Sequence, residues 1–279
     1  MSNTIACFVA ILTGISVAAG CKKGTAIPYE PYEEHIRLEN ATDSALYAIY
    51  KEYQTKIIYR WDRRYITADA FASPPEYELV LPYVENVLRK LFIAPYDRQK
   101  ADFMRANMPI EMILFGTKMN YVEGDERNFS ASGVAYGLSR VIVTGVNGYD
   151  LKDGAWLRNQ YATLHHEFAH VLDKKYGRPE AFDKVSEGKY AGGTSYAVYS
   201  QAEARSRGFW RNYGMSNESE DFASWVDGIV TTPKAKVLDI VAQNDLLQQK
   251  YKIVYNFYLD KGIDLHELQA YLQSILDNL

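Results

Sequence analysis

The chain has 279 residues, of which 47% are hydrophobic and 24% are charged, and its formal net charge is −4. This length is enough for one large domain or two small ones with a substantial core. A slightly acidic chain without a basic surplus does not indicate nucleic-acid binding, so that class of function is excluded. The function must therefore be sought in local motifs.

The first element in chain order is an apolar run without charge over residues 5–17. It is too short to span a bilayer as a stable helix and is typical of a signal-peptide core. Small residues precede Cys21, as in a bacterial lipobox, which is cut before a cysteine that then carries lipid. We expect a signal peptide over residues 1–20 and a lipidated tether over 21–41. A plain secreted protein and a buried N-terminal helix are the alternatives.

One domain is expected over residues 42–279, with an N-terminal lobe over 42–176 and a helical C-terminal lobe over 177–279. Apolar spacing predicts helices over 43–58, 77–93 and 97–106, then strands over 109–115, 133–138 and 141–144, the last two being separate or one bent strand. A polar loop is expected over 123–132. Helices over 155–176, 218–229, 234–258 and 265–276 follow, with a loop rich in glycine and tyrosine over 186–199. The order is typical of an α+β fold.

The helix expected over 155–176 has clear boundaries, because Asp153 can cap its start and Gly177 can end it. One narrow apolar stripe of this helix must face a core. Its members are Leu157, Tyr161, Leu164, Phe168 and Val171. His166 and His170 lie on the opposite side, one turn and about 40° apart. Both imidazoles can therefore reach one metal ion.

Residues 166–170 read His-Glu-Phe-Ala-His, the His-Glu-x-x-His pattern of zinc hydrolases. The histidines offer neutral nitrogen ligands, and zinc lowers the pKa of a coordinated water to about 7. Glu167 is rotated by about 100° from His166, so it cannot share that position and can act instead as general base. The alternative is a helix with two surface histidines. His165 points to another side and is expected to be structural.

Zinc needs one more protein ligand and an open position for water. Zinc enzymes that use a third histidine have it shortly after the motif, preceded by a glycine, but Asp173 and Tyr176 occupy those two places here. The remaining common choice is a glutamate on a later helix. The stretch 213–225 offers two, Glu218 and Glu220.

At these residues the chain resembles the zinc-binding metallopeptidase lipoproteins of Bacteroidetes, which are described as metallohydrolases associated with substrate import. The resemblance spans nearly the whole chain, but only two blocks are specific, 163–173 and 208–223. Both blocks also resemble the protease domain of anthrax lethal factor, a gluzincin, in which a Tyr-Gly pair is followed by a glutamate ligand seven residues after the tyrosine. The resemblance implies that Glu220 is the third ligand and that Tyr213 stabilises the oxyanion of the tetrahedral intermediate.

One position departs from that family pattern. The pattern continues Glu-Asp-Phe-Ala-Glu, whereas this chain has Ser224 in the last place. The missing acid is expected to orient a ligand histidine, a role that Asp221 or Asp173 could take over. Asp221 can also be read as an ordinary acid in the first turn of a helix, and Tyr213 as a surface tyrosine.

Helical geometry separates the two candidate glutamates by about 200°. Glu218 shares a side with Phe222 and the rest of an apolar stripe, whereas Glu220 lies beside Ala223 and Ser224, whose small side chains permit close approach to the motif helix. A capping box formed by residues 217 and 220 is the competing interpretation, in which Glu220 only satisfies the start of its helix.

The sequence thus predicts a zincin-like α+β fold with a small twisted sheet and one Zn²⁺ per chain, acting on peptide or protein substrates. The strand near 134–138 is the candidate edge for an extended substrate. The resemblance implies a lipid anchor in the cell envelope, at the outer membrane, and a TonB-dependent importer with its binding lipoprotein as partners. A non-catalytic lipoprotein that binds a nutrient, and an amidase acting on non-peptide substrates, are the rival hypotheses.

Overall fold

The N-terminal part of the fold is helical, and its helices are shorter than the sequence predicts. The computed structural model describes residues 38–123 and 127–278, all within the unit Arg37–Leu279, so the predicted signal peptide and Cys21 lie outside the described residues. Helix α1 (Ala41–Tyr53) ends where Gln54 takes a left-handed conformation, and strand β1 (Lys56–Ile58) follows. The prediction of one helix over 43–58 is therefore wrong at its end.

The helix predicted over 77–93 is confirmed as α2 (Tyr77–Tyr83) continued by the π-helix η2 (Val84–Ile93). The one predicted over 97–106 is two short helices, α3 (Ala94–Gln99) and α4 (Phe103–Asn107). Single 3-10 turns occur at η1 (Arg63–Tyr65) and η3 (Val146–Gly148).

A mixed four-stranded sheet follows the order β1-β3-β7-β6. Its further strands are β3 (Glu111–Leu114), β6 (Gly133–Tyr136) and β7 (Arg140–Val143). Strand β3 runs parallel to both of its neighbours, whereas β6 runs antiparallel to β7. Strand β6 is therefore the edge of the sheet, as predicted for the stretch 134–138.

The prediction of a polar loop over 123–132 is wrong. The chain forms an antiparallel hairpin there, made of β4 (Met119–Glu123) and β5 (Arg127–Ala131). The short strand β2 (Ala70–Phe71) completes this second sheet by pairing with β4.

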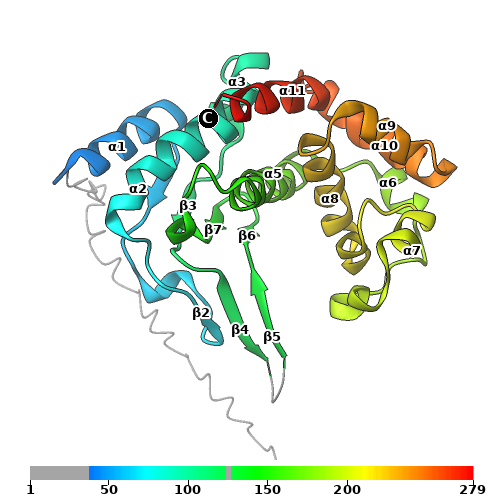
Figure 1. Ribbon diagram of the computed structural model, residues 1–279, viewed down its shortest axis with the longest axis horizontal. Helices are drawn as coiled ribbons and strands as arrows, with labels where there is room; N and C mark the ends of the chain where they lie inside the picture. The colour runs from blue at the N-terminus through cyan, green and yellow to red at the C-terminus, as the bar shows by residue number, and fades with distance from the viewer. Residues whose placement is uncertain (1–37, 124–126, 279) are drawn as a thin grey trace, which may run out of the picture. The chain divides into compact units, whose positions relative to one another are not determined.

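Helix α5 (Gly154–Tyr176) lies between the first sheet and the C-terminal helices, with β6 on one side and α8 on the other (Figure 1). The side chain of Asp153 accepts hydrogen bonds from the first turn, and Gly177 ends the helix with a φ of 71°. The five residues of the predicted apolar stripe are all buried. This packing fixes which face of α5 turns toward α8.

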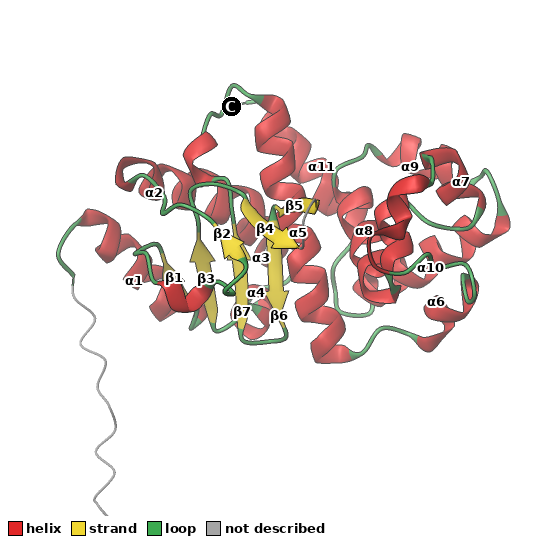
Figure 2. Cartoon of the chain, turned by 90° about the horizontal axis from the view of Figure 1, so that it is seen from below, coloured by secondary structure: helices red, strands yellow, loops and turns green. Residues whose placement is uncertain are grey.

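The C-terminal part is helical, as predicted (Figure 2). Its elements are α6 (Glu180–Val185), η4 (Gly193–Val198), α7 (Gln201–Ser206), η5 (Asn212–Ser216), α8 (Glu218–Val230), α9 (Lys234–Val241), α10 (Asp245–Leu259) and α11 (Leu265–Leu276). The single helix predicted over 234–258 is divided, because Asn244 caps a new helix. The α+β fold class is confirmed. Within the described residues no helix is both long and apolar enough to cross a bilayer.

Candidate metal centre

Three side chains from two helices converge on one point. His166 and His170 come from α5 and Glu220 from the first turn of α8, and their donor atoms all lie within 4.8 Å of one another. One carboxylate oxygen, Oε2 of Glu220, lies 2.9 Å from Nε2 of His166 and 3.4 Å from Nε2 of His170. The structure thus brings together the three residues predicted as metal ligands.

The other ring nitrogen of His166 is held by a residue that the sequence analysis missed. Its Nδ1–H donates to Oδ2 of Asp227 at 2.7 Å. The guanidinium of Arg211 donates to both oxygens of the same carboxylate, at 2.8 and 2.6 Å. This arrangement fixes the ring and leaves Nε2 directed at the shared point.

Asp227 was detectable in the sequence. It lies seven residues, about two turns, after Glu220 and therefore on the same face of α8. Burial alone would lower the pKa of His166, but hydrogen bonds with Asp227 and Glu220 outweigh burial and raise that pKa to about 10. The surroundings of His166 therefore favour a positive charge at its imidazole ring.

His170 is oriented by a relay. Its Nδ1–H donates to the hydroxyl of Ser219 at 2.9 Å, and Ser219 in turn donates to Asp173 at 3.4 Å. Asp173 also accepts a hydrogen bond of 2.6 Å from Arg178. Of the two acids predicted to orient a ligand histidine, Asp173 reaches His170 in this indirect way.

Asp221 does not contact either histidine, contrary to the expectation for it. Its buried carboxylate contacts the ammonium of Lys250 and accepts a hydrogen bond of 3.0 Å from the hydroxyl of Tyr190. The reason is geometric, since Asp221 is rotated by about 100° from Glu220 on the helix. Asp227 takes the place that the sequence analysis gave to Asp221.

Glu167 lies buried beside the three converging side chains. Burial raises the pKa of its carboxyl above the ordinary value, while the neighbouring histidines and a hydrogen bond from the backbone N–H of Ala135 act in the opposite direction. Ala135 is on edge strand β6. At Gly133, on the same strand, an added Cβ would come within 2.8 Å of Oε1 of Glu167. Strand β6 thus approaches this carboxylate closely.

Tyr213, on η5, faces the same point from the other side. Its ring centroid is 5.9 Å from that of His166. Burial, together with the charges of Glu220 and Glu167, raises the pKa of the phenol, which also hydrogen-bonds to Glu220. Tyr213 is therefore a neutral hydroxyl donor at neutral pH. It is not a surface tyrosine.

The direction of the Glu220 side chain decides between capping and metal binding as its role. The amide of Asn217 accepts a hydrogen bond of 2.9 Å from the backbone N–H of Glu220, so Asn217 does cap α8. The carboxylate of Glu220 is directed at the histidines. His165, in contrast, is buried with both ring nitrogens hydrogen-bonded, to the hydroxyl of Tyr96 and the carbonyl of Leu91, and is structural as expected.

Two cavities adjoin at this point. One, of about 570 Å³, extends along α5 toward its start and is bordered by Gly193 and Thr194 of the glycine-rich loop. The other, of about 830 Å³, extends toward the end of α5 along Val134 and Ala135 of β6. Both include Glu167 in their walls. The converging residues therefore lie in the middle of a cleft edged by β6, which among the described strands pairs with β7 alone.

The donor set fits zinc. Two imidazoles and one carboxylate are the ligands of many catalytic zinc sites, which leave a position open. In each histidine Nδ1 lies within hydrogen-bonding distance of an oxygen and Nε2 faces the shared point, the orientation in which Nδ1–H donates and Nε2 can bind a metal. The carboxylate between the rings supplies negative charge.

Comparisons with known proteins agree with this geometry. Residues 37–266 match a protein family described as "putative zinc-binding metallo-peptidase". A crystal structure from Bacteroides caccae, of a protein described in the same words, has a similar fold, with a TM-score of 0.65 and 23% sequence identity, over 85% of this chain and 93% of that one. No curated protein matches. The chain belongs to the family of zinc-binding metallo-peptidases that its sequence matches over residues 37–266.

Proposed function

We propose that the protein is a zinc-dependent peptidase that hydrolyses peptide bonds. The observation that carries this proposal is the convergence of His166, His170 and Glu220 beside the buried carboxylate of Glu167, within a cleft edged by β6. Bound zinc would supply a Lewis acid that acidifies water and polarises a carbonyl group. Residues of the chain would transfer the proton, stabilise the developing negative charge and bind the peptide.

Each residue has a role that follows from its place. Glu167, whose carboxyl is buried and near the ligands, takes a proton from the attacking water and returns it to the departing amine. Its raised pKa suits both transfers. Tyr213, a neutral donor, stabilises the negative oxygen that develops on the substrate carbonyl. Among the described strands β6 pairs with β7 alone. The backbone groups of its other edge, apart from the Ala135 N–H bound to Glu167, are therefore those to which an extended peptide can add as a further strand.

The rival hypothesis of a non-catalytic lipoprotein rested on Ser224, which stands where an orienting acid is usual. Asp227 supplies that acid from the next turn of the same helix. The arrangement around His166 therefore retains what hydrolysis requires, and we favour the enzyme.

A kinetic series tests the mechanism. In Glu167→Gln the proton acceptor is lost while all three ligands remain, so we expect bound zinc near one per chain and almost no turnover of a short-peptide library. In Tyr213→Phe we expect kcat to fall about tenfold or more with little change in KM, since the donor acts in the transition state. Metal analysis and library digestion measure both. A Glu167→Gln protein with wild-type turnover would refute the mechanism.

We also propose that Cys21 carries lipid and anchors the protein in the cell envelope, where it serves nutrient import with a TonB-dependent importer. The support is the small-residue run before Cys21 and the resemblance to import-associated lipoproteins. Labelled palmitate should enter the wild type expressed in a bacterial host and be absent from Cys21→Ser. Equal labelling of the two proteins would exclude the anchor.

A further inference from the structure

The two arms of the cleft differ in charge. The arm toward the start of α5 has neutral polar groups at its far end, among them Asn159, Thr163 and Thr194, and its charged residues all belong to the metal centre. The arm toward the end of α5 is lined by Asp173 and Arg178, which belong to the relay that orients His170, and by one further charged residue, Lys174.

Of these three side chains, Lys174 is the one without a charged partner among the described residues. Arg178 bonds to Asp173 at 2.6 Å and to Asp183 at 2.7 Å, so these three neutralise one another in part. The side chain of Lys174 is exposed, and among the described residues it has no hydrogen bond or ion pair. A free ammonium therefore lines this arm of the cleft.

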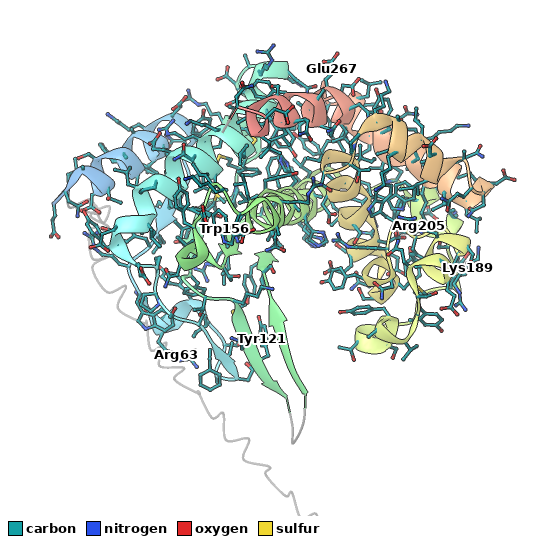
Figure 3. The ribbon with its side chains drawn as sticks, in the orientation of Figure 1. Arg63, Tyr121, Trp156, Lys189, Arg205 and Glu267 are labelled. Carbon is teal, nitrogen blue, oxygen red and sulfur yellow. The ribbon has the colours of Figure 1, made fainter. Side chains whose placement is uncertain are left out.

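Lys174 lies close to the predicted metal ligands along α5. It follows His170 by one helical turn on the same face of α5, about 6 Å further along the axis. A bound peptide advances about 3.3 Å per residue along β6. The ammonium is thus within reach of a group two to three residues from the reacting bond. Tyr121, whose side chain lies at β4 (Figure 3), is among the residues that line this arm.

We propose that Lys174 is a specificity residue that binds a carboxylate of the substrate, so that the peptidase prefers peptides with an anionic group on one side of the cleaved bond. This inference rests on the proposed function. The carboxylate could belong to an acidic side chain or to the C-terminus of the peptide, and the chemistry at Lys174 is the same for both. The cation that lines the other arm, Arg211, is paired with Asp227, so that arm accepts neutral residues.

The test compares matched peptide mixtures. Short fluorogenic peptides are randomised over neutral residues. In one kind of pair the two members carry a glutamate or a glutamine at the same position, which is varied in turn, and in the second kind they have a free or an amidated C-terminus. The measured quantity is the ratio of kcat/KM within each pair. The wild type should favour the anionic member, and Lys174→Glu should lower the ratio by about tenfold, because an attraction becomes a repulsion. The pair that responds identifies the source of the carboxylate.

Lys175→Glu is the matched control. Lys175 has the same charge and neighbours Lys174, but its ammonium bonds to the carbonyl of Ala106, away from the cleft. Its ratios should equal those of the wild type. Equal ratios in Lys174→Glu and Lys175→Glu would overturn the inference.

Failure of the proposed function gives a different result. If zinc-loaded wild type cleaves none of the mixtures, the peptidase proposal fails, and anisotropy binding to Glu167→Gln protein with and without Lys174→Glu then decides the inference. A preference for the anionic members that Lys174→Glu abolishes would support the carboxylate site. Equal affinities would overturn it.

Discussion

At the scale of single residues, Asp227 orients His166, one of the predicted metal ligands. This carboxylate accepts from Nδ1–H of His166 and is itself held by both terminal nitrogens of Arg211. Ser224, at the place of the usual acid, is buried, and its hydroxyl has no partner among the described residues. The carboxylate that contacts His166 comes instead from Asp227, one turn further along α8.

Replacing Asp227 should loosen the site without removing a ligand. In Asp227→Asn the ring of His166 loses a charged partner, and we expect zinc affinity to fall about tenfold or more, the range found for outer partners of ligand histidines. Competition with a chelator measures it. Asp239→Asn, an exposed acid on α9, is the control. An affinity as high as that of the control would show that Asp227 does not orient His166.

At the scale of elements, what could be predicted depended on how strongly local sequence determines each element. Helix α5 was placed almost to the residue because its cap, its apolar stripe and Gly177 agree. The hairpin β4–β5 was missed because polar residues are frequent in its sequence, although residues 128–131 alternate between polar and apolar as in an antiparallel strand with one buried face. The end of α1 at Gln54 was not predicted because no glycine or proline marks it in the sequence.

The residues of the site likewise differ in how far the local sequence determines them. The two histidines and Glu167 follow from spacing within one helix, which sequence reveals directly. The choice of Glu220 needed a resemblance, because it depends on how α8 packs against α5. The pairing of Asp227 with His166 depends on the same packing.

The contact between β6 and α5 gives a prediction at this scale. In Gly133→Ala, the new Cβ would lie 2.7 Å from Cγ2 of Thr163 and 2.8 Å from Cγ and Oε1 of Glu167, so the side chain of Glu167 must move together with that of Thr163. We expect zinc content to be kept and kcat to fall by about tenfold to a hundredfold, the cost of displacing a catalytic group by about 1 Å. Gly154→Ala, where an added Cβ meets nothing within 4 Å, is the control. Wild-type turnover in Gly133→Ala would argue against this close approach.

At the scale of the whole described fold, α8 joins the metal centre to the C-terminal helices. Its residue Glu220 faces α5, while the next residue, Asp221, pairs with Lys250 of α10. Both side chains of this pair are fully buried. The ammonium lies 4.2 Å from the ring centroid of Phe209, over its face. Burial raises the pKa of Asp221, and Lys250 opposes that shift, so each charge depends on the other.

Removing one partner of this pair should destabilise the fold more than removing both charges. Lys250→Met leaves a buried carboxylate without its cation, which costs about 3–5 kcal/mol of unfolding free energy. Combining it with Asp221→Asn should restore part of that loss, because no uncompensated charge remains. Urea unfolding of zinc-loaded protein measures both, with Lys252→Met, an exposed lysine of the same helix, as control. If Lys250→Met unfolds at the same urea concentration as Lys252→Met, the pair does not hold α10 to the ligand-bearing helix.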